Sequence, residues 1–158
     1  MIEYRKTNIN DVTELVRLRI EFLKETRNVQ TDSNDSEIQK SLTEYFRTTL
    51  NNNSFIAWLA LADGRIVGTS GLCFYTLVPS YRNLTGKVAY IMNMYTQPVY
   101  RHRGIATYLF QKMIDEAQNL GYQKLVLHAS EQGRPLYQKF GFKNADNEMI
   151  LNMVEYLG

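Results

Sequence analysis

The sequence predicts an α/β (α+β) fold in which about four helices flank a central mixed sheet that is mostly antiparallel. An Asp63-Gly64 pair between two apolar runs predicts an antiparallel hairpin, because a two-residue type I′ turn needs positive φ at both positions. Further along, an apolar run at 87–96, an amphipathic run at 105–120 and a compact apolar run at 124–129 follow one another. This order predicts a strand, helix, strand unit with a right-handed connection and two parallel strands.

The beginning of the chain predicts a strand and a helix. Residues 2–6 alternate in part and predict the first strand. Asp11 with Glu14 three residues later has the pattern of a capping box, so a helix is expected from there to about Glu25. Residues 27–34 are polar and predict a loop.

Apolar and aromatic side chains at three- and four-residue spacing predict a second helix, capped by Asn34 or Asp35 and stopped by the asparagine run 51–53. These side chains are Ile38, Leu42, Tyr45, Phe46 and Leu50. Residues 55–62 and 65–78 then predict the two strands of the hairpin.

The strand predicted at 87–96 is apolar on both faces, which is typical of a buried strand. Its alternation places Val88, Tyr90, Met92 and Met94 on one face and Ala89, Ile91 and Tyr95 on the other. Gly121 is expected to stop the helix that follows. A short helix at 132–140, ended by Gly141, and a last strand at 147–154 complete the predicted order.

Composition and charge indicate one globular domain spanning residues 1–158 and argue against several classes of protein. The 18 basic and 16 acidic residues leave a net charge of +2, too balanced for a nucleic-acid binder that works by bulk electrostatics. The single Cys73 excludes an internal disulfide and, with two distant histidines, offers no metal-ligand spacing, so a reducing cytoplasm is expected. The N-terminus lacks an apolar signal core and no 18 uncharged apolar residues run together, so neither secretion nor a membrane span is expected.

The segment 95–106 joins a strand to a helix and is the first candidate site. Pro98 cannot donate to a sheet ladder and ends the strand, while Gly104 lets the backbone approach a ligand closely. A helix N-terminus carries unpaired N–H groups and a partial positive charge, so a phosphate or pyrophosphate gains several hydrogen bonds there. Arg101 and Arg103 add charge, although two arginines at a helix start also fit an ordinary solvated turn.

Two short motifs lie about thirty residues apart. Arg101-His102-Arg103-Gly104-Ile105-Ala106 fits the pattern Arg/Gln-x-x-Gly-x-Gly/Ala, and Leu136-Tyr137-Gln138-Lys139-Phe140-Gly141-Phe142 fits Leu-Tyr-x-Lys-x-Gly-Phe. With both motifs and the order of predicted elements, the whole chain resembles the GNAT superfamily of acyl-CoA-dependent N-acetyltransferases. The resemblance implies a GNAT-type fold in which the two parallel strands splay apart.

The resemblance also implies a site for acetyl-CoA as co-substrate and no metal. In the family, the amides of this turn and helix start hold the pyrophosphate of coenzyme A, which here implicates Arg101, His102, Arg103, Gly104, Ile105, Ala106 and Thr107. The pantetheine arm pairs like an extra strand with the edge exposed by the splay, which implicates the backbone of Met94, Tyr95 and Thr96. Ser130 either contacts the pantetheine or caps the following helix.

The implied activity is direct transfer of an acetyl group to a primary amine of a small molecule or peptide, with no covalent enzyme intermediate. A main-chain N–H near Met94 or Tyr95 would stabilise the developing oxyanion. Tyr137 matches the family tyrosine that can protonate the leaving sulfur, and a phenol with a pKa of about 10 is protonated at neutral pH. In the alternative interpretation, Tyr137 packs its ring and hydrogen-bonds the cofactor without transferring a proton.

The base that deprotonates the amine is not identified by the sequence. Many family members place a glutamate in the strand before the motif, but residues 90–95 contain no carboxylate, and Asn93 cannot act as a base. The candidates are Glu21, Glu25, Glu148, water or a backbone carbonyl.

Other polar and aromatic residues have structural interpretations. Cys73 is expected to be a small core residue, because no histidine stands in a recognisable partnership with it. His128 is expected to be a core or cleft residue and not a ligand. Tyr75, Tyr81 and Tyr95 are candidates to line an acceptor pocket.

Two other functions compete with acetyl transfer. A non-catalytic acyl-CoA-binding sensor of the same fold is favoured by the missing carboxylate. A nucleic-acid binder would use Arg101, Arg103 and Lys112 as a basic patch, but the balanced charge and the Asp115-Glu116 pair on the same helix argue against it. The acceptor is not identified, and the oligomeric state is open, with a homodimer among the alternatives.

Overall fold

The computed structural model describes residues 1–27, 35–145 and 148–157, which form two compact units, Met1–His128 and Ala129–Gly158. Most of the polar run predicted as a loop, with the candidate cap Asn34, lies outside the described residues. No helix in the described ranges is long and apolar enough to cross a membrane.

The first unit is built on a five-stranded sheet whose strands follow one another in chain order. The strands are β1 (Ile2–Lys6), β2 (Phe55–Ala62), β3 (Arg65–Thr76), β4 (Lys87–Thr96) and β5 (Leu125–Leu127). β1 to β4 pair antiparallel, whereas β4 and β5 pair parallel. The predicted hairpin and parallel pair are therefore confirmed, although β3 ends before residue 78 and β5 is shorter than the predicted strand at 124–129.

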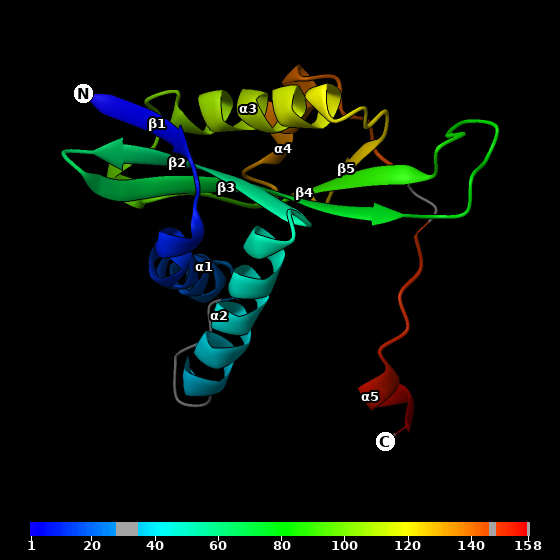
Figure 1. Cartoon of the computed structure of the whole chain (residues 1–158), viewed down its shortest axis with the longest axis horizontal. Helices are drawn as coiled ribbons and strands as arrows, with labels where there is room; N and C mark the ends of the chain where they lie inside the picture. Colours follow the sequence, from blue (N-terminus) through cyan, green and yellow to red (C-terminus); the bar gives the residue numbers. More distant parts are fainter. Residues whose placement is uncertain (28–34, 146–147, 158) are drawn as a thin grey trace. The chain divides into compact units, whose positions relative to one another are not determined.

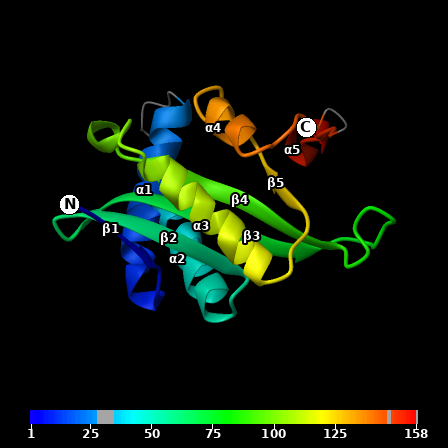
Figure 2. The same ribbon diagram turned by 90° about the horizontal axis from the view of Figure 1, so that it is seen from above.

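Helices cover both faces of this sheet (Figure 1). α1 (Val12–Arg27) and α2 (Asp35–Asn51) pack on one face, and α3 (Ile105–Asn119) packs on the other, as Figure 2 also shows. Each face has its own apolar core. Leu15, Leu18, Phe46, Phe55 and Leu59 belong to the core beneath α1 and α2, and Ala60, Val67, Ile105 and Leu109 belong to the core beneath α3. The three amphipathic patterns thus form the helices that they predict.

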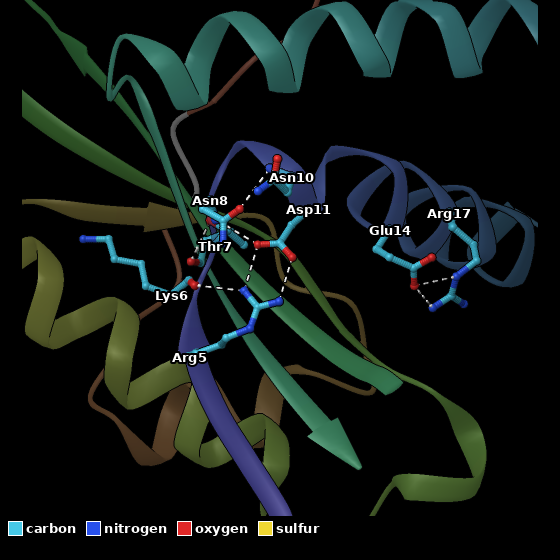
Figure 3. Close-up of polar contacts among 9 residues, drawn as sticks. Arg5, Lys6, Thr7, Asn8, Asn10, Asp11, Glu14 and Arg17 are labelled. Carbon is cyan, nitrogen blue, oxygen red and sulfur yellow. Dashed lines mark hydrogen bonds and ion pairs between the residues drawn. The ribbon is translucent and has the colours of Figure 1, made fainter. Parts of the chain in front are cut away.

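The start of α1 is capped by Asn8, not by Asp11 as predicted (Figure 3). The Asn8 side chain accepts a backbone hydrogen bond, and the Asp11 carboxylate accepts the Asn8 N–H at 2.8 Å in return. This capping box opens the short 3₁₀ helix η1 (Ile9–Asp11), which leads into α1. The predicted box of Asp11 with Glu14 is wrong, because the chain already turns at Asn8 and Glu14 binds Arg17 at 2.7 Å.

The Asp11 carboxylate also ties the helix start to the sheet. It accepts two hydrogen bonds from the Arg5 guanidinium of β1, at 2.7 and 2.8 Å, in the forked geometry visible in Figure 3. The Asp11 side chain is only 8% exposed, so this ion pair is shielded from water on the carboxylate side. Such paired, charge-assisted hydrogen bonds are stronger than those between neutral groups.

β4 contains a bulge at Asn93, which changes the side chains that share a face. Asn93 has a positive φ of 56°, and the pairing with β3 shifts by one residue between Met92 and Tyr95. Met92 and Tyr95 pack in the core beneath α1 and α2, whereas Met94 packs in the core beneath α3. The predicted placement of Met92 and Met94 on one face is therefore wrong, because the extra residue interrupts the alternation.

The second unit holds two short helices, α4 (Arg134–Lys139) and α5 (Met153–Leu157). α4 confirms the short helix predicted there. The last strand predicted at 147–154 is wrong, because the described residues before α5 form no strand and α5 begins inside that range. Met149 is 96% exposed and Ile150 83%, and an apolar pattern forms no strand unless its backbone finds a ladder partner.

We predict that Asp11→Asn lowers the free energy of unfolding by about 1–3 kcal/mol at neutral pH, the range for a charged hydrogen bond and a helix cap. The Arg5 hydrogen bonds, with help from the Asn8 N–H, hold the pKa of Asp11 below its ordinary value. Because the folded-state pKa is the lower one, this stabilisation is complete above about pH 4 and is lost as pH falls through the folded pKa.

Urea unfolding at neutral pH and at about pH 3 measures both effects. Asp63→Asn, in the exposed hairpin turn where φ is 49°, is the matched control and should change little, because asparagine tolerates positive φ. The prediction is contradicted if the difference in the free energy of unfolding between Asp11→Asn and wild type is the same at about pH 3 as at neutral pH.

Candidate functional site

The chain leaves β4 through a short 3₁₀ turn, η2 (Pro98–Tyr100), and enters α3 at an open N-terminus. Gly104 is the N-cap, with a positive φ of 78°, and no side chain caps the helix. The Tyr108 N–H donates to the Gly104 carbonyl at 3.0 Å, so the N–H groups before it have no acceptor within the helix. These groups belong to Ile105, Ala106 and Thr107. A Cβ at Gly104 would meet no atom within 4 Å, which leaves room for a ligand beside the helix start.

The Arg101 side chain joins the end of β4 to α1. Its Nε donates to the Thr96 carbonyl at 2.9 Å, and a terminal nitrogen binds the Glu25 carboxylate at 2.7 Å. The guanidinium carbon also lies 5.8 Å from the centroid of the Tyr95 ring. The side chain therefore holds the turn in place, and the Arg101 main-chain N–H closes the turn by donating to the Pro98 carbonyl at 3.2 Å.

The two residues that follow Arg101 are exposed. His102 has a positive φ of 61°, like Gly104, so the backbone bends twice within three residues. The Arg103 guanidinium carbon lies 5.3 Å from the centroid of the Tyr100 ring, a cation–π contact at the end of η2. The Arg103 side chain adds positive charge next to the helix N-terminus.

β4 extends well beyond its pairing with β5. The parallel ladder ends at Ile91, whereas β4 continues to Thr96 and stays paired with β3 as far as Gly68. Among the named strands, the backbone of Tyr95 and Thr96 thus pairs with β3 alone, and Met94, at the bulge, has no register partner in β3 or β5. This is the splay that the resemblance implies, and it leaves a strand edge to which an extended ligand can add.

The two carboxylates of α1 proposed as bases are both ion-paired. Glu21 accepts hydrogen bonds from Arg17 at 2.5 Å and from the Gln97 side chain at 3.2 Å. Glu25 binds Arg101 at 2.6 Å. Both carboxylates of α1 therefore already bind side chains of the protein. In the described ranges, no group of three or more His, Cys, Asp or Glu side chains could hold a metal ion.

A pocket of about 190 Å³ lies on the face of the sheet that α1 and α2 cover, next to the bulge. Its walls are Arg19, Leu42, Tyr45, Phe46, Phe55, Met92 and Asn93. Gly71 makes room for one wall, because a Cβ there would lie 2.5 Å from the Phe55 ring. A second hollow, formed by polar side chains of α2 alone, contains none of these residues.

The Asn93 side chain is the buried polar group of this pocket. The residue is 4% exposed, and neither polar atom of its carboxamide has a hydrogen-bond partner. Within the described residues, the buried side-chain polar atoms without a partner all belong to Thr69, Ser70 and Asn93, which lie at the bulge. Each such group costs about 1–3 kcal/mol. Because these unpaired polar groups lie together at the bulge, they require an explanation, and a ligand that binds there would provide it.

Cys73 lies next to the pocket and has the structural role expected of it. Its Sγ is 3.0 Å from the Tyr45 hydroxyl and 3.0 Å from the Met92 sulfur. Burial raises the pKa of the Cys73 thiol, which disfavours the reactive thiolate. The thiol therefore packs against the pocket walls Tyr45 and Met92 and is not a nucleophile.

The other sequence candidates of the first unit lie away from the pocket walls. His128 is exposed and forms a hydrogen bond with the Tyr90 hydroxyl. Tyr75 and Tyr81 are 40% and 103% exposed, and neither is a wall of the pocket. Tyr95 is buried beneath α1 and is not a wall either.

The second unit carries the remaining candidates. Ser130 Oγ accepts the Gly133 N–H at 3.1 Å in the turn before α4, whose N-cap is Gly133 and has no side-chain cap. Tyr137 lies in α4 with its ring centroid 6.5 Å from that of Phe142. Burial raises the pKa of the Tyr137 phenol, which keeps it protonated over a wider range of pH. Glu148 is exposed.

Residues 15–142 match the sequence model of the acetyltransferase (GNAT) family, and the chain belongs to this family. The structure is similar to that of a predicted acetyltransferase with acetyl-CoA from Clostridium acetobutylicum, at 37% identity over 98% of each chain and a TM-score of 0.91. It is also similar to a GCN5-related N-acetyltransferase from Ralstonia eutropha JMP134, at 25% identity over 97% of this chain and 99% of that one, with a TM-score of 0.86. The predicted resemblance is thus confirmed.

A curated relative is the glucosamine 6-phosphate N-acetyltransferase of Trypanosoma brucei brucei. It is 29% identical to this chain over 90 residues, which make up 57% of this chain and 59% of the relative. The match therefore spans less than two thirds of that relative's length.

Sequence reasoning did not find the pocket walls Arg19, Tyr45 and Asn93. Asn93 did carry a signal, since asparagine is one of the few non-glycine residues that tolerate positive φ. A lone asparagine within an apolar strand is therefore a mark of a bulge. Arg19 and Tyr45 belong to no motif and meet Asn93 only through the fold.

The bulge predicts an unusual order of stabilities at position 93. Because φ is 56° there, Asn93→Ala should be less stable than Asn93→Gly by about 1–2 kcal/mol, the cost of a left-handed conformation for an ordinary residue. Urea unfolding of both variants measures the difference. The matched pair at Asn119 in the last turn of α3 should show the opposite order, since alanine is favoured over glycine in a helix. If the same variant, alanine or glycine, is the more stable one at both positions, the positive φ assigned to Asn93 is contradicted.

Proposed function

We propose that residues 1–158 act as one N-acetyltransferase domain that moves an acetyl group from acetyl-CoA to a primary amine of a small molecule or peptide. One observation carries the proposal: the one-sided edge of β4 leads through the short turn η2 to the open N-terminus of α3. Family membership supports the same conclusion. The single, partly buried Cys73 fits a reducing cytoplasm as the compartment.

The residues of this segment fit coenzyme A. The main-chain N–H groups of His102, Arg103, Gly104, Ile105, Ala106 and Thr107 would hold the pyrophosphate at the helix N-terminus, whereas the Arg101 N–H already donates to the Pro98 carbonyl at 3.2 Å. Gly104 leaves open space for it. The backbone of Met94, Tyr95 and Thr96 would pair with the pantetheine arm as an added strand does. Ser130 uses its oxygen as an acceptor for Gly133 and keeps its own proton to donate to the same arm.

The chain would promote acetyl transfer mainly by position and hydrogen bonding. Bound acetyl-CoA supplies a thioester whose carbonyl carbon is open to attack by a neutral amine. A main-chain N–H of Met94 or Tyr95 donates to the carbonyl oxygen and stabilises its developing charge. Tyr137 donates its proton to the leaving sulfur, and the raised pKa of its phenol keeps that proton available. Since Glu21 and Glu25 are ion-paired, water or a backbone carbonyl is the better candidate to receive the proton of the amine.

A non-catalytic acyl-CoA sensor is the second candidate function. The observation that favours it is the absence of a carboxylate in β4, where Asn93 lies, together with the ion pairs of Glu21 and Glu25. An assay for free thiol, run with acetyl-CoA and a broad panel of primary amines, separates the two functions. Thiol release that depends on an amine identifies the enzyme, whereas tight binding of acetyl-CoA without turnover identifies the sensor.

The proposed pyrophosphate site predicts the effect of Gly104→Ala. The Cβ would project into the space assigned to the pyrophosphate and would strain a backbone whose φ is 78°, so we expect the Kd for coenzyme A to rise about tenfold or more. Isothermal titration calorimetry measures it. Gly121→Ala at the other end of α3 is the matched control, because φ there is 76° and a Cβ also meets no atom within 4 Å. Equal weakening by both variants would mean that strain, and not the ligand site, is responsible.

The proposed role of Tyr137 predicts a kinetic separation. Tyr137→Phe keeps the ring and removes the proton donor, so kcat should fall about 10²–10⁴-fold, the usual contribution of a general acid, with a much smaller change in KM for acetyl-CoA. The rate of thiol release under saturating acetyl-CoA measures it. If Tyr137 packs its ring and hydrogen-bonds the cofactor without transferring a proton, KM will rise and kcat will stay close to that of the wild type.

A further inference from the structure

The pocket next to Asn93 adjoins the place proposed for the acetyl group. Asn93 directly precedes Met94, whose main-chain N–H is proposed to donate to the acetyl carbonyl oxygen. Successive residues of a strand are about 3.3 Å apart, so a ligand that binds the Asn93 carboxamide lies within reach of the acetyl carbon. The inference rests on the proposed function for this placement, and otherwise on the pocket itself.

The Asn93 carboxamide is built to receive a polar ligand group. It has one acceptor oxygen and two N–H donors, and none of them is used within the described chain. A ligand that supplies a partner would remove the cost of burying this group unpaired. A primary amine can donate one N–H to Oδ1 while its lone pair points elsewhere, which is the orientation that attack on a carbonyl carbon requires.

Arg19 gives the pocket its charge. It is the charged residue among the seven pocket walls, and its guanidinium carbon lies 5.3 Å from the centroid of the Phe22 ring. A guanidinium has five N–H donors, so it can keep contacts inside the protein and still bind a carboxylate or phosphate through two parallel hydrogen bonds.

The remaining walls limit the size and chemistry of the ligand. Leu42, Phe46, Phe55 and Met92 are apolar or aromatic, and they line the pocket together with Asn93 and Arg19. The volume of about 190 Å³ equals that of about six water molecules at roughly 30 Å³ each. The part of the acceptor that enters the pocket is therefore a few non-hydrogen atoms long.

We propose that this pocket selects, as acceptor, a small primary amine that carries an anionic group. Asn93 positions the amine beside the acetyl group, and Arg19 binds the anion, which is a carboxylate or a phosphate. The apolar walls enclose the short segment between the two groups. The acceptor class is thus a small anionic amine and not a lysine side chain of a folded protein, which carries no such anion.

The test compares matched amines with and without the anion. The pairs are phosphoethanolamine with ethanolamine, glucosamine 6-phosphate with glucosamine, and 4-aminobutyrate with butylamine. The phosphate and carboxylate pairs identify which anion is preferred. Thiol release with acetyl-CoA gives kcat/KM for each amine, and the ratio within a pair is the specificity.

We expect the wild-type protein to favour the anionic member of at least one pair by about 10–100-fold, and Arg19→Gln to bring that ratio close to one. Arg19→Lys should keep part of the preference, since it keeps the charge and loses the forked geometry. Arg47→Gln, at an exposed position of α2 outside this pocket, is the control and should keep the wild-type ratio. Asn93→Gly should lower kcat/KM for both members of a pair by similar factors, because the Asn93 carboxamide is proposed to bind the amine, which both members carry.

Calorimetry keeps this test separate from that of the proposed function. Binding of each amine to the protein saturated with coenzyme A requires no turnover, so it reports on the pocket even if no amine is acetylated. Tighter binding of the anionic member, lost in Arg19→Gln, supports the inference. It is overturned if neither binding nor turnover distinguishes the members of any pair, or if the preference persists in Arg19→Gln.

Discussion

The bulge at Asn93 is the constraint on which the arrangement of the site depends. Before it, β4 pairs on both sides and alternates regularly, and after it the strand pairs only with β3. The extra residue sends Met94 towards α3 and brings Met92 and Tyr95 to the opposite core. One irregularity thus ends the regular sheet, creates the strand edge proposed for pantetheine, and places an unpaired carboxamide beside the pocket.

A second set of contacts keeps this irregular region in place. Arg101 joins Thr96 at the end of β4 to Glu25 on α1, and Gln97 reaches Glu21 one turn earlier on the same helix. The carboxylates of α1 are therefore used to hold the turn. This explains in physical terms why they are poor candidates for the base, since a group that anchors the backbone through an ion pair cannot also accept a proton without loosening it.

The sequence predicts the parts of the fold that depend on local patterns. It does not predict the parts that depend on contacts between residues far apart in the chain. The helices over residues 12–27, 35–51 and 105–119 and the Asp63-Gly64 hairpin follow from periodicity and turn chemistry, and the turn at Gly104 follows from a motif. The bulge at Asn93 is not predicted, because alternation alone does not reveal an inserted residue. The prediction of a strand at 147–154 is wrong, because a strand forms only where its backbone can pair with a partner strand. The pocket could not be predicted, since Arg19, Tyr45 and Asn93 come from three elements and share no spacing.

Gly71 has a consequence for how this protein can change over evolutionary time. It never lines the pocket, yet the Phe55 ring lies across it at a distance that leaves no space for a methyl group. An alanine there would displace the ring, which is a wall of the pocket, and would change the shape of the space for the acceptor. A descendant could therefore acquire a different acceptor by one mutation at a residue outside the pocket, with every residue that contacts the ligand unchanged.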